Sequence, residues 1–128
     1  MTDLLGRRIL IVEDEILIAL MLQDVLETLG CVVAGIAVQQ AEALHLIEAN
    51  PGALDAVTLD INLGDETSHE IAALLNACGI PFIVTTGYED ALNLIGFENR
   101  PRLQKPYHES DVEQVFRALN WGKQAAPG

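Results

Sequence analysis

Hydrophobic and polar positions divide this chain into two kinds of segment. Short, almost uninterrupted apolar runs alternate with longer stretches in which apolar residues recur every three or four positions. The first pattern is typical of strands buried on both faces of a parallel sheet, and the second of helices that cover such a sheet. Strands are predicted at residues 7–13, 31–37, 54–60, 80–86 and 101–105. Helices are predicted at residues 15–30, 39–52, 68–77 and 109–122, with at best a short one at 89–96.

This alternation predicts an α/β fold, a doubly wound five-stranded parallel sheet with helices on both faces. Residues 61–68 are predicted to be a polar loop, and Ser110 or Asp111 is predicted to cap the closing helix. The length of 128 residues suits one domain. We expect that domain to span residues 1–121, with a flexible tail at 122–128.

The first predicted helix carries more apolar residues than a core stripe needs. At helical spacing we expect the core positions to be Ile18, Leu22, Val25 and Leu29. A second face would then be exposed, formed by Ile16, Ala19, Leu20 and Gln23. Because exposed apolar faces usually mark contacts, this face is a candidate docking surface.

Charge narrows the function classes. Seven Lys and Arg stand against 19 Asp and Glu, a net charge of −12, which opposes binding to nucleic acid or to anionic membranes. The longest apolar run, residues 16–22, is too short to span a bilayer, and acidic residues follow the start too closely for a secretory signal. We therefore expect a soluble cytoplasmic protein in which Cys31 and Cys78 are reduced, largely buried thiols.

Polar and charged side chains occupy the ends of the predicted strands. The first strand leads into Glu13 and Asp14, the third ends in Asp60, the fourth in Thr86, and Lys105 closes the fifth. Ligands of doubly wound sheets bind beyond the carboxyl ends of the strands. Like charges ~4 Å apart repel by about 4 kcal/mol at an effective dielectric near 20, so clustered carboxylates need a cation. Mg²⁺ suits such oxygen ligands, and the pattern predicts that Asp60 is a nucleophile beside a metal site.

The segments "RILIVEDE", "VTLDINL", "PFIVTTGY" and "LQKPY" together resemble the receiver domain of response regulators in two-component signalling, over residues 7–121. The resemblance implies the flavodoxin-like strand order 2-1-3-4-5. The fourth-strand segment is also similar to a subgroup of bacterial receivers with the signature Pro-Phe-x-Phe-Ala-Thr-Gly-Tyr, several of which stand alone. We expect a stand-alone receiver, with no DNA-binding or catalytic module after residue 121.

The resemblance also implies roles for single residues. Asp60 would be the phosphoacceptor, taking a phosphoryl group from a phosphohistidine. Thr86 would bind a phosphoryl oxygen, and Lys105 would pair with the phosphoryl group, with a cis peptide bond to Pro106. The implied ligands of Mg²⁺ are Glu13, Asp14, Asp60 and the backbone carbonyl of Asn62.

Partners and readout follow from the same resemblance. The phosphodonor would be a sensor histidine kinase or a histidine phosphotransfer protein, whose helical hairpin would dock on the exposed face of the first helix. The protein would be a signalling phosphoacceptor in a two-component system or phosphorelay, not an enzyme, and would act by protein–protein contact with an unknown downstream protein or by onward phosphotransfer. Arg102 stands where many receivers carry an aromatic switch residue. We therefore expect residues 87–101, with Tyr88, to become ordered on phosphorylation and to report it.

Three other functions compete with this interpretation. A phosphatase of the haloacid-dehalogenase type has a second aspartate two positions after its nucleophile, but Asn62 cannot act as that general acid. A flavodoxin-like binder needs a phosphate loop after the first strand, where Glu13, Asp14 and Glu15 would repel phosphate. A receiver could also signal by binding alone, without phosphorylation.

Overall fold

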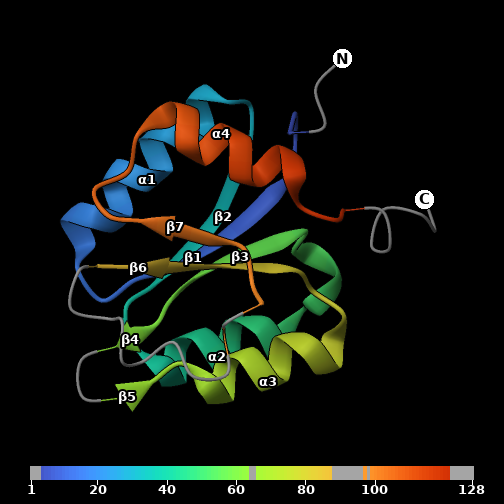
Figure 1. The fold of residues 1–128 in the computed structure, drawn as a ribbon. Helices are drawn as coiled ribbons and strands as arrows, with labels where there is room; N and C mark the ends of the chain where they lie inside the picture. The colour runs from blue at the N-terminus through green and yellow to red at the C-terminus, as the bar shows by residue number, and fades with distance from the viewer. Residues whose placement is uncertain (1–3, 64–65, 88–96, 98, 122–128) are drawn as a thin grey trace.

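The computed structural model describes residues 4–63, 66–87, 97 and 99–121 (Figure 1). Three sequence-based expectations fall wholly or mostly outside this part of the chain. They are the tail at 122–128, the possible helix at 89–96, and the switch segment 87–101 with Tyr88.

Five parallel strands form the central sheet in the order β2-β1-β3-β6-β7 (Figure 1). Their bounds are β1 Arg8–Val12, β2 Val32–Ala37, β3 Ala56–Asp60, β6 Phe82–Thr86 and β7 Arg102–Gln104. Each lies inside a segment predicted to be a strand, and the order is the one implied by the resemblance. The predicted fold class is therefore confirmed. β3 lies at the centre of the sheet with every residue buried, because helices cover both faces.

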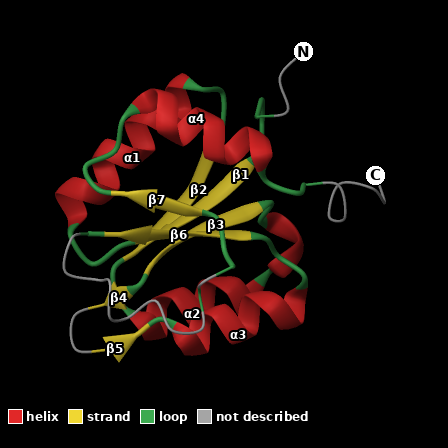
Figure 2. Ribbon diagram, in the orientation of Figure 1, coloured by secondary structure: helices red, strands yellow, loops and turns green. Residues whose placement is uncertain are grey.

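Helices cover the sheet in two layers, one on each face (Figure 2). One layer holds α1 (Ile16–Thr28) and α4 (Glu109–Ala118), and the other holds α2 (Gln40–Ala49) and α3 (His69–Cys78). A short 3₁₀ helix, η1 (Pro51–Ala53), follows α2. Each layer packs its own apolar core against the sheet. Among the described residues, no helix combines the length and apolar character that crossing a membrane requires.

The core-facing side of α1 differs from the prediction. Its buried residues are Ala19, Leu22 and Leu26. Ala19, expected on the exposed face, is wholly buried, whereas Ile18 is only half-buried. Because every residue from 16 to 22 is apolar, the sequence pattern does not single out the side that meets the sheet. The packing of α1 against β1, β2 and α4 decides its orientation instead.

The loop predicted after β3 contains two short strands that the sequence did not indicate. Within it, β4 (Asn62–Leu63) and β5 (Glu66–Thr67) pair as an antiparallel hairpin, which projects beside the amino end of α2 and α3 (Figure 1). Strands of two residues are too short to show an alternating pattern, so the sequence carried no sign of them. The hairpin joins the end of β3 to the start of α3.

The predicted cap of the closing helix is wrong. The residue before α4 is His108, which makes no side-chain capping hydrogen bond. Ser110 and Asp111 instead lie in the first turn. Glu109 and Asp111 place negative charge at the positive end of the helix dipole, which stabilises the helix start without a side-chain cap.

Candidate functional site

A charged cluster forms where the carboxyl ends of β1, β3 and β7 meet. The ammonium nitrogen Nζ of Lys105 lies 2.8 Å from Glu13 Oε1 and 3.2 Å from Asp60 Oδ2. Glu13 and Asp60 are each only 2 % exposed. One cation therefore serves two buried carboxylates that lie at the ends of neighbouring strands.

Backbone hydrogen bonds hold the three residues in place. Asp60 is the last residue of β3, in register with Thr85 of β6. Lys105 follows β7 directly, and its N–H donates to the carbonyl of Thr86 at 2.8 Å. The peptide bond from Lys105 to Pro106 is cis, as the resemblance implied. Glu13 follows β1, and its N–H donates to the carbonyl of Ala37 at 2.9 Å.

The protonation equilibria of the cluster reflect its burial. Burial and, after it, the nearby Glu13 carboxylate together raise the pKa of Asp60 to about 8, although Lys105 opposes the shift. Burial by itself would lower the pKa of Lys105, but Glu13 and Asp60 hold that pKa above its usual value. At neutral pH the cluster therefore favours a protonated Asp60, and a second cation could take the place of that proton and let both carboxylates ionise.

Oxygen donors for such a cation lie next to the cluster. Carboxylate oxygens of Glu13, Asp14 and Glu15 come within 4.8 Å of one another. Asp14 and Glu15 are exposed, so an ion could reach them while it kept bound water. An all-oxygen set that is open to water fits Mg²⁺. Glu15 was not among the predicted ligands, and its position directly after two acidic residues was the available signal.

The remaining predicted site residues lie close to Asp60. The N–H of Asn62 donates to Asp60 Oδ1 at 3.2 Å, which fixes the turn that follows β3. Thr86 ends β6 and is half-buried, one residue beyond the position that pairs with Asp60. The carboxyl ends of the strands thus bring together the predicted nucleophile Asp60, the Thr86 hydroxyl, the Lys105 ammonium group and the Asn62 backbone amide.

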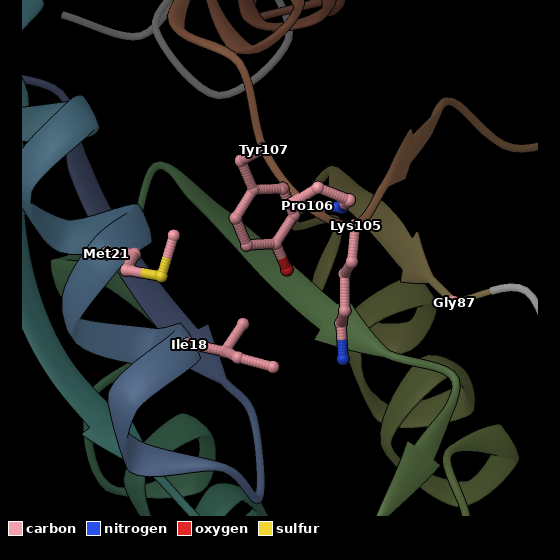
Figure 3. A pocket seen from close by; sticks show the side chains of 6 residues that line it. All are labelled: Ile18, Met21, Gly87, Lys105, Pro106 and Tyr107. Atoms are coloured by element: carbon pink, nitrogen blue, oxygen red, sulfur yellow. The ribbon is translucent and has the colours of Figure 1, made fainter.

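An apolar pocket of about 280 Å³ opens beside the charged cluster. It is lined by Ile18, Met21, Gly87, Lys105, Pro106 and Tyr107. Figure 3 shows Ile18 and Met21 projecting from α1 toward the ring of Tyr107, with Lys105 on the other side of that ring. Burial raises the pKa of the Tyr107 phenol to about 12, so the ring stays neutral at physiological pH.

Two residues of this region were not predicted. Tyr107 follows Lys105 and Pro106 directly, and only its proximity to Lys105 in the sequence pointed to it. Ser68 was interpreted as the start of a helix. In the structure Ser68 is fully buried and its hydroxyl donates to the backbone carbonyl of Asp60. Nothing in the local sequence distinguishes that role from a helix cap.

Comparisons with known proteins agree with this geometry. The family model described as "Response regulator receiver domain" matches residues 9–117. The phyllosphere-induced regulator PhyR of Methylorubrum extorquens is 32% identical over 128 aligned residues, which cover 95% of this chain and 46% of PhyR. The chain therefore spans about half the length of that relative.

Two solved structures are similar over almost their whole length. SdrG from Sphingomonas melonis is 42% identical, with a TM-score of 0.78, over 90% of this chain and 96% of SdrG. The receiver domain of PhyR from Erythrobacter litoralis is 28% identical, with a TM-score of 0.74, over 93% of this chain and 96% of that domain.

Proposed function

This chain belongs to the response regulator receiver domain family, and from that membership we propose that it takes a phosphoryl group from a phosphohistidine onto Asp60. The observation that carries the proposal is the position of Lys105 Nζ, 2.8 Å from Glu13 and 3.2 Å from Asp60. A buried carboxylate can accept a phosphoryl group when an ammonium group lies beside it and nearby oxygen ligands can hold a metal cation, because the two cations balance the added negative charge.

The side chains of this site divide the work of phosphoryl transfer. An oxygen of Asp60 forms a bond to phosphorus while the bond from phosphorus to the donor imidazole nitrogen breaks, and that nitrogen keeps the electron pair. Lys105 favours the ionised form of Asp60 and pairs with the phosphoryl oxygens. Thr86 donates its hydroxyl to one of those oxygens. Bound Mg²⁺, held by Glu13, Asp14, Asp60 and the backbone carbonyl of Asn62, would supply further positive charge for the phosphoryl oxygens.

The same site favours a signalling phosphoacceptor over the alternatives. Asn62 offers no ionisable proton where the haloacid-dehalogenase phosphatases have a general acid. The carboxylates of Glu13, Asp14 and Glu15 lie together where a flavodoxin-like binder would hold phosphate. We propose that the phosphorylated protein acts by contact with a downstream protein or by onward phosphotransfer. We also propose a cytoplasmic location, which two free thiols support, although Cys78 is exposed rather than buried as predicted.

We expect the protein to gain one phosphoryl group when it is incubated with Mg²⁺ and a small phosphodonor such as acetyl phosphate. Intact mass gives the number of groups, and peptide mapping places the group on Asp60. A chelator should stop the uptake, because Mg²⁺ supplies charge that the site lacks. Uptake that persists at full rate without metal, or that maps to another residue, would refute the proposal.

The exposed half of α1 is the proposed docking surface for the phosphodonor, a histidine kinase or phosphotransfer protein. This docking patch consists of Ile16, Leu17, Leu20 and Met21, which are 50%, 73%, 46% and 52% exposed. It continues into the apolar pocket through Met21 and lies beside the residues that hold Asp60. The exposed acidic residues Asp14, Glu15 and Asp24 flank it in the sequence. An apolar patch with an acidic rim fits a helical partner whose apolar face is flanked by basic residues.

Leu17→Glu is expected to slow transfer from the phosphodonor protein by about tenfold or more, since a charge would enter the centre of an apolar contact. Transfer from acetyl phosphate should be unchanged, because Leu17 does not touch Asp60. The matched control is Leu5→Glu: Leu5 is 74% exposed, against 73% for Leu17, and it lies before β1, at the amino end of that strand, whereas the site lies at the carboxyl ends. Stopped-flow or gel-based assays measure the rate of phosphoryl transfer from each of the two donors. Equal slowing with both donors, or none with the protein donor, would contradict docking at this patch.

A further inference from the structure

Ser68 stands at the start of α3, where serine commonly caps a helix, but its side chain does not serve that helix. The residue is the N-cap of α3 and makes no side-chain capping hydrogen bond. Its hydroxyl donates instead to the backbone carbonyl of Asp60, eight residues earlier in the chain. Ser68 is fully buried, so water cannot take the place of this hydroxyl. A group that could have bonded to the backbone of its own helix is thus committed to the residue that we propose as phosphoacceptor.

This hydrogen bond closes the base of the β4–β5 hairpin. Asp60 ends β3 and Ser68 directly precedes α3, so the Ser68 hydroxyl joins the two ends of the segment that contains the hairpin. The backbone of Ser68 is itself fixed, since its carbonyl accepts from the N–H of Ala72 at 3.0 Å in the first turn of α3. The hydroxyl is therefore presented to Asp60 by a rigid helix rather than by a loop.

Three hydrogen bonds converge on the short segment that begins at Asp60. The N–H of Ile61 donates to the carbonyl of Thr85 at 3.2 Å, and the N–H of Asn62 donates to Asp60 Oδ1 at 3.2 Å. The third bond comes from the Ser68 hydroxyl, which donates to the Asp60 carbonyl. The direction of the Asp60 carboxylate and the position of the Asn62 backbone both depend on the orientation of these peptide groups.

We propose that Ser68 is a positioning residue for phosphorylation, whose hydroxyl fixes the peptide group between Asp60 and Ile61. Through that peptide it sets the direction of the Asp60 carboxylate and the position of the Asn62 backbone. The inference rests on the proposed function in so far as Asp60 accepts the phosphoryl group. Ser68 acts through the Asp60 backbone, to which its hydroxyl is bonded, and takes no part in the transfer itself.

Ser68→Ala and Ser68→Gly both remove the hydroxyl, and glycine is well tolerated at a helix start. We expect each variant to be phosphorylated by acetyl phosphate about tenfold more slowly, in the range usual for residues that orient a reacting or ligating group. The half-saturating Mg²⁺ concentration, followed by amide NMR shifts at residues 60–62, should rise as well. Amide hydrogen exchange at Ile61 and Asn62 should become faster in the variants, without any phosphodonor present.

The matched control is Ile71→Val, a change in the same helix at a buried residue that packs into the core between α3 and the sheet. This substitution lowers stability without removing a hydrogen bond to Asp60. Its phosphorylation rate and its amide hydrogen exchange at Ile61 should therefore stay close to those of the wild-type protein. Equal slowing by Ile71→Val, or unchanged rate and exchange in both Ser68 variants, would overturn the proposal. If the wild-type protein takes up no phosphoryl group, the proposed function fails. The exchange at Ile61 and Asn62 then still tests the positioning by itself.

Discussion

Asp60→Asn is expected to abolish phosphoryl uptake and, in metal-free buffer, to raise the melting temperature of the protein. The first effect follows because an amide is not a nucleophile toward phosphorus and leaves the donor without an acceptor. The second follows because Asp60 and Glu13 are both buried while Lys105 alone compensates their charge. The neutral amide removes one of the two carboxylates that compete for that ammonium group.

The stabilisation should depend on pH in a defined direction. The pKa of Asp60 is about 4 in an unfolded chain, and burial raises it to about 8 in the folded protein. Between these values the folded state retains a proton that the unfolded state has released. The free energy of unfolding therefore falls as pH rises from about 4 to about 8. Asp60→Asn removes this dependence, so its advantage over the unmodified protein should grow across that range.

Urea denaturation at about pH 5 and about pH 8, in the presence of a chelator, measures the difference. Asp55→Asn is the control. Burial by itself would raise the pKa of Asp55, but the hydrogen bonds and charge of Arg8 lower it, so this carboxylate stabilises the fold. The control should lose stability, by about 0.2–1 kcal/mol, because the pair lies near the surface. A variant Asp60→Asn that is less stable than the unmodified protein at about pH 8 would contradict the expectation.

Lys105→Met is expected to have the second largest effect, slowing phosphorylation by about 100-fold and lowering stability by about 3 kcal/mol at neutral pH. Methionine keeps much of the side-chain volume but leaves Glu13 and Asp60 without their shared cation. Both carboxylates lie almost wholly out of water, and the lysine side chain itself is only 16% exposed. The rate falls because no ammonium group remains to pair with the phosphoryl oxygens.

A double-mutant cycle separates the interaction of Lys105 with Asp60 from the other effects of losing Lys105. Lys105→Met combined with Asp60→Asn should recover part of the lost stability, since only Glu13 then stays buried without a partner. Urea denaturation of the four proteins gives the coupling free energy, and acetyl phosphate assays of the two proteins that keep Asp60 give the effect of Lys105 on the rate. Arg117→Met is the control for loss of a positive charge, because Arg117 pairs with Glu113 at the surface of α4. If the stability changes of the two single variants simply add in the double variant, Lys105 and Asp60 do not interact.

Much of the charged cluster could be predicted because its members lie at strand ends. In a parallel sheet all strands run in the same direction, so the residues that end neighbouring strands lie close together whatever the details of packing. Glu13, Asp60 and Lys105 are placed by this rule alone. The rule gives no distances, so the sharing of Lys105 between the two carboxylates came only from the structure.

The orientation of α1 and the structure of the loop after β3 could not be predicted from the sequence. Ala19 was expected outside and is buried, because residues 16–22 are apolar on all sides of α1 and carry no preferred face. The β4–β5 hairpin was missed because each strand has two residues. Both features depend on contacts between segments distant in the chain, which a local pattern does not record.

By itself, then, the sequence determined the alternation of strands and helices, the buried character of the strands, and the edge of the sheet at which Glu13, Asp60 and Lys105 would gather. These follow from periodicity and chain direction, which are local properties. Only the tertiary structure decided which side of α1 meets the sheet, which apolar residues remain exposed beside Asp60, and where the Ser68 hydroxyl goes. Serine before a helix can bond to its own helix or to a neighbour, and the choice depends on which acceptor the fold brings within reach. In this protein that acceptor is the carbonyl of Asp60.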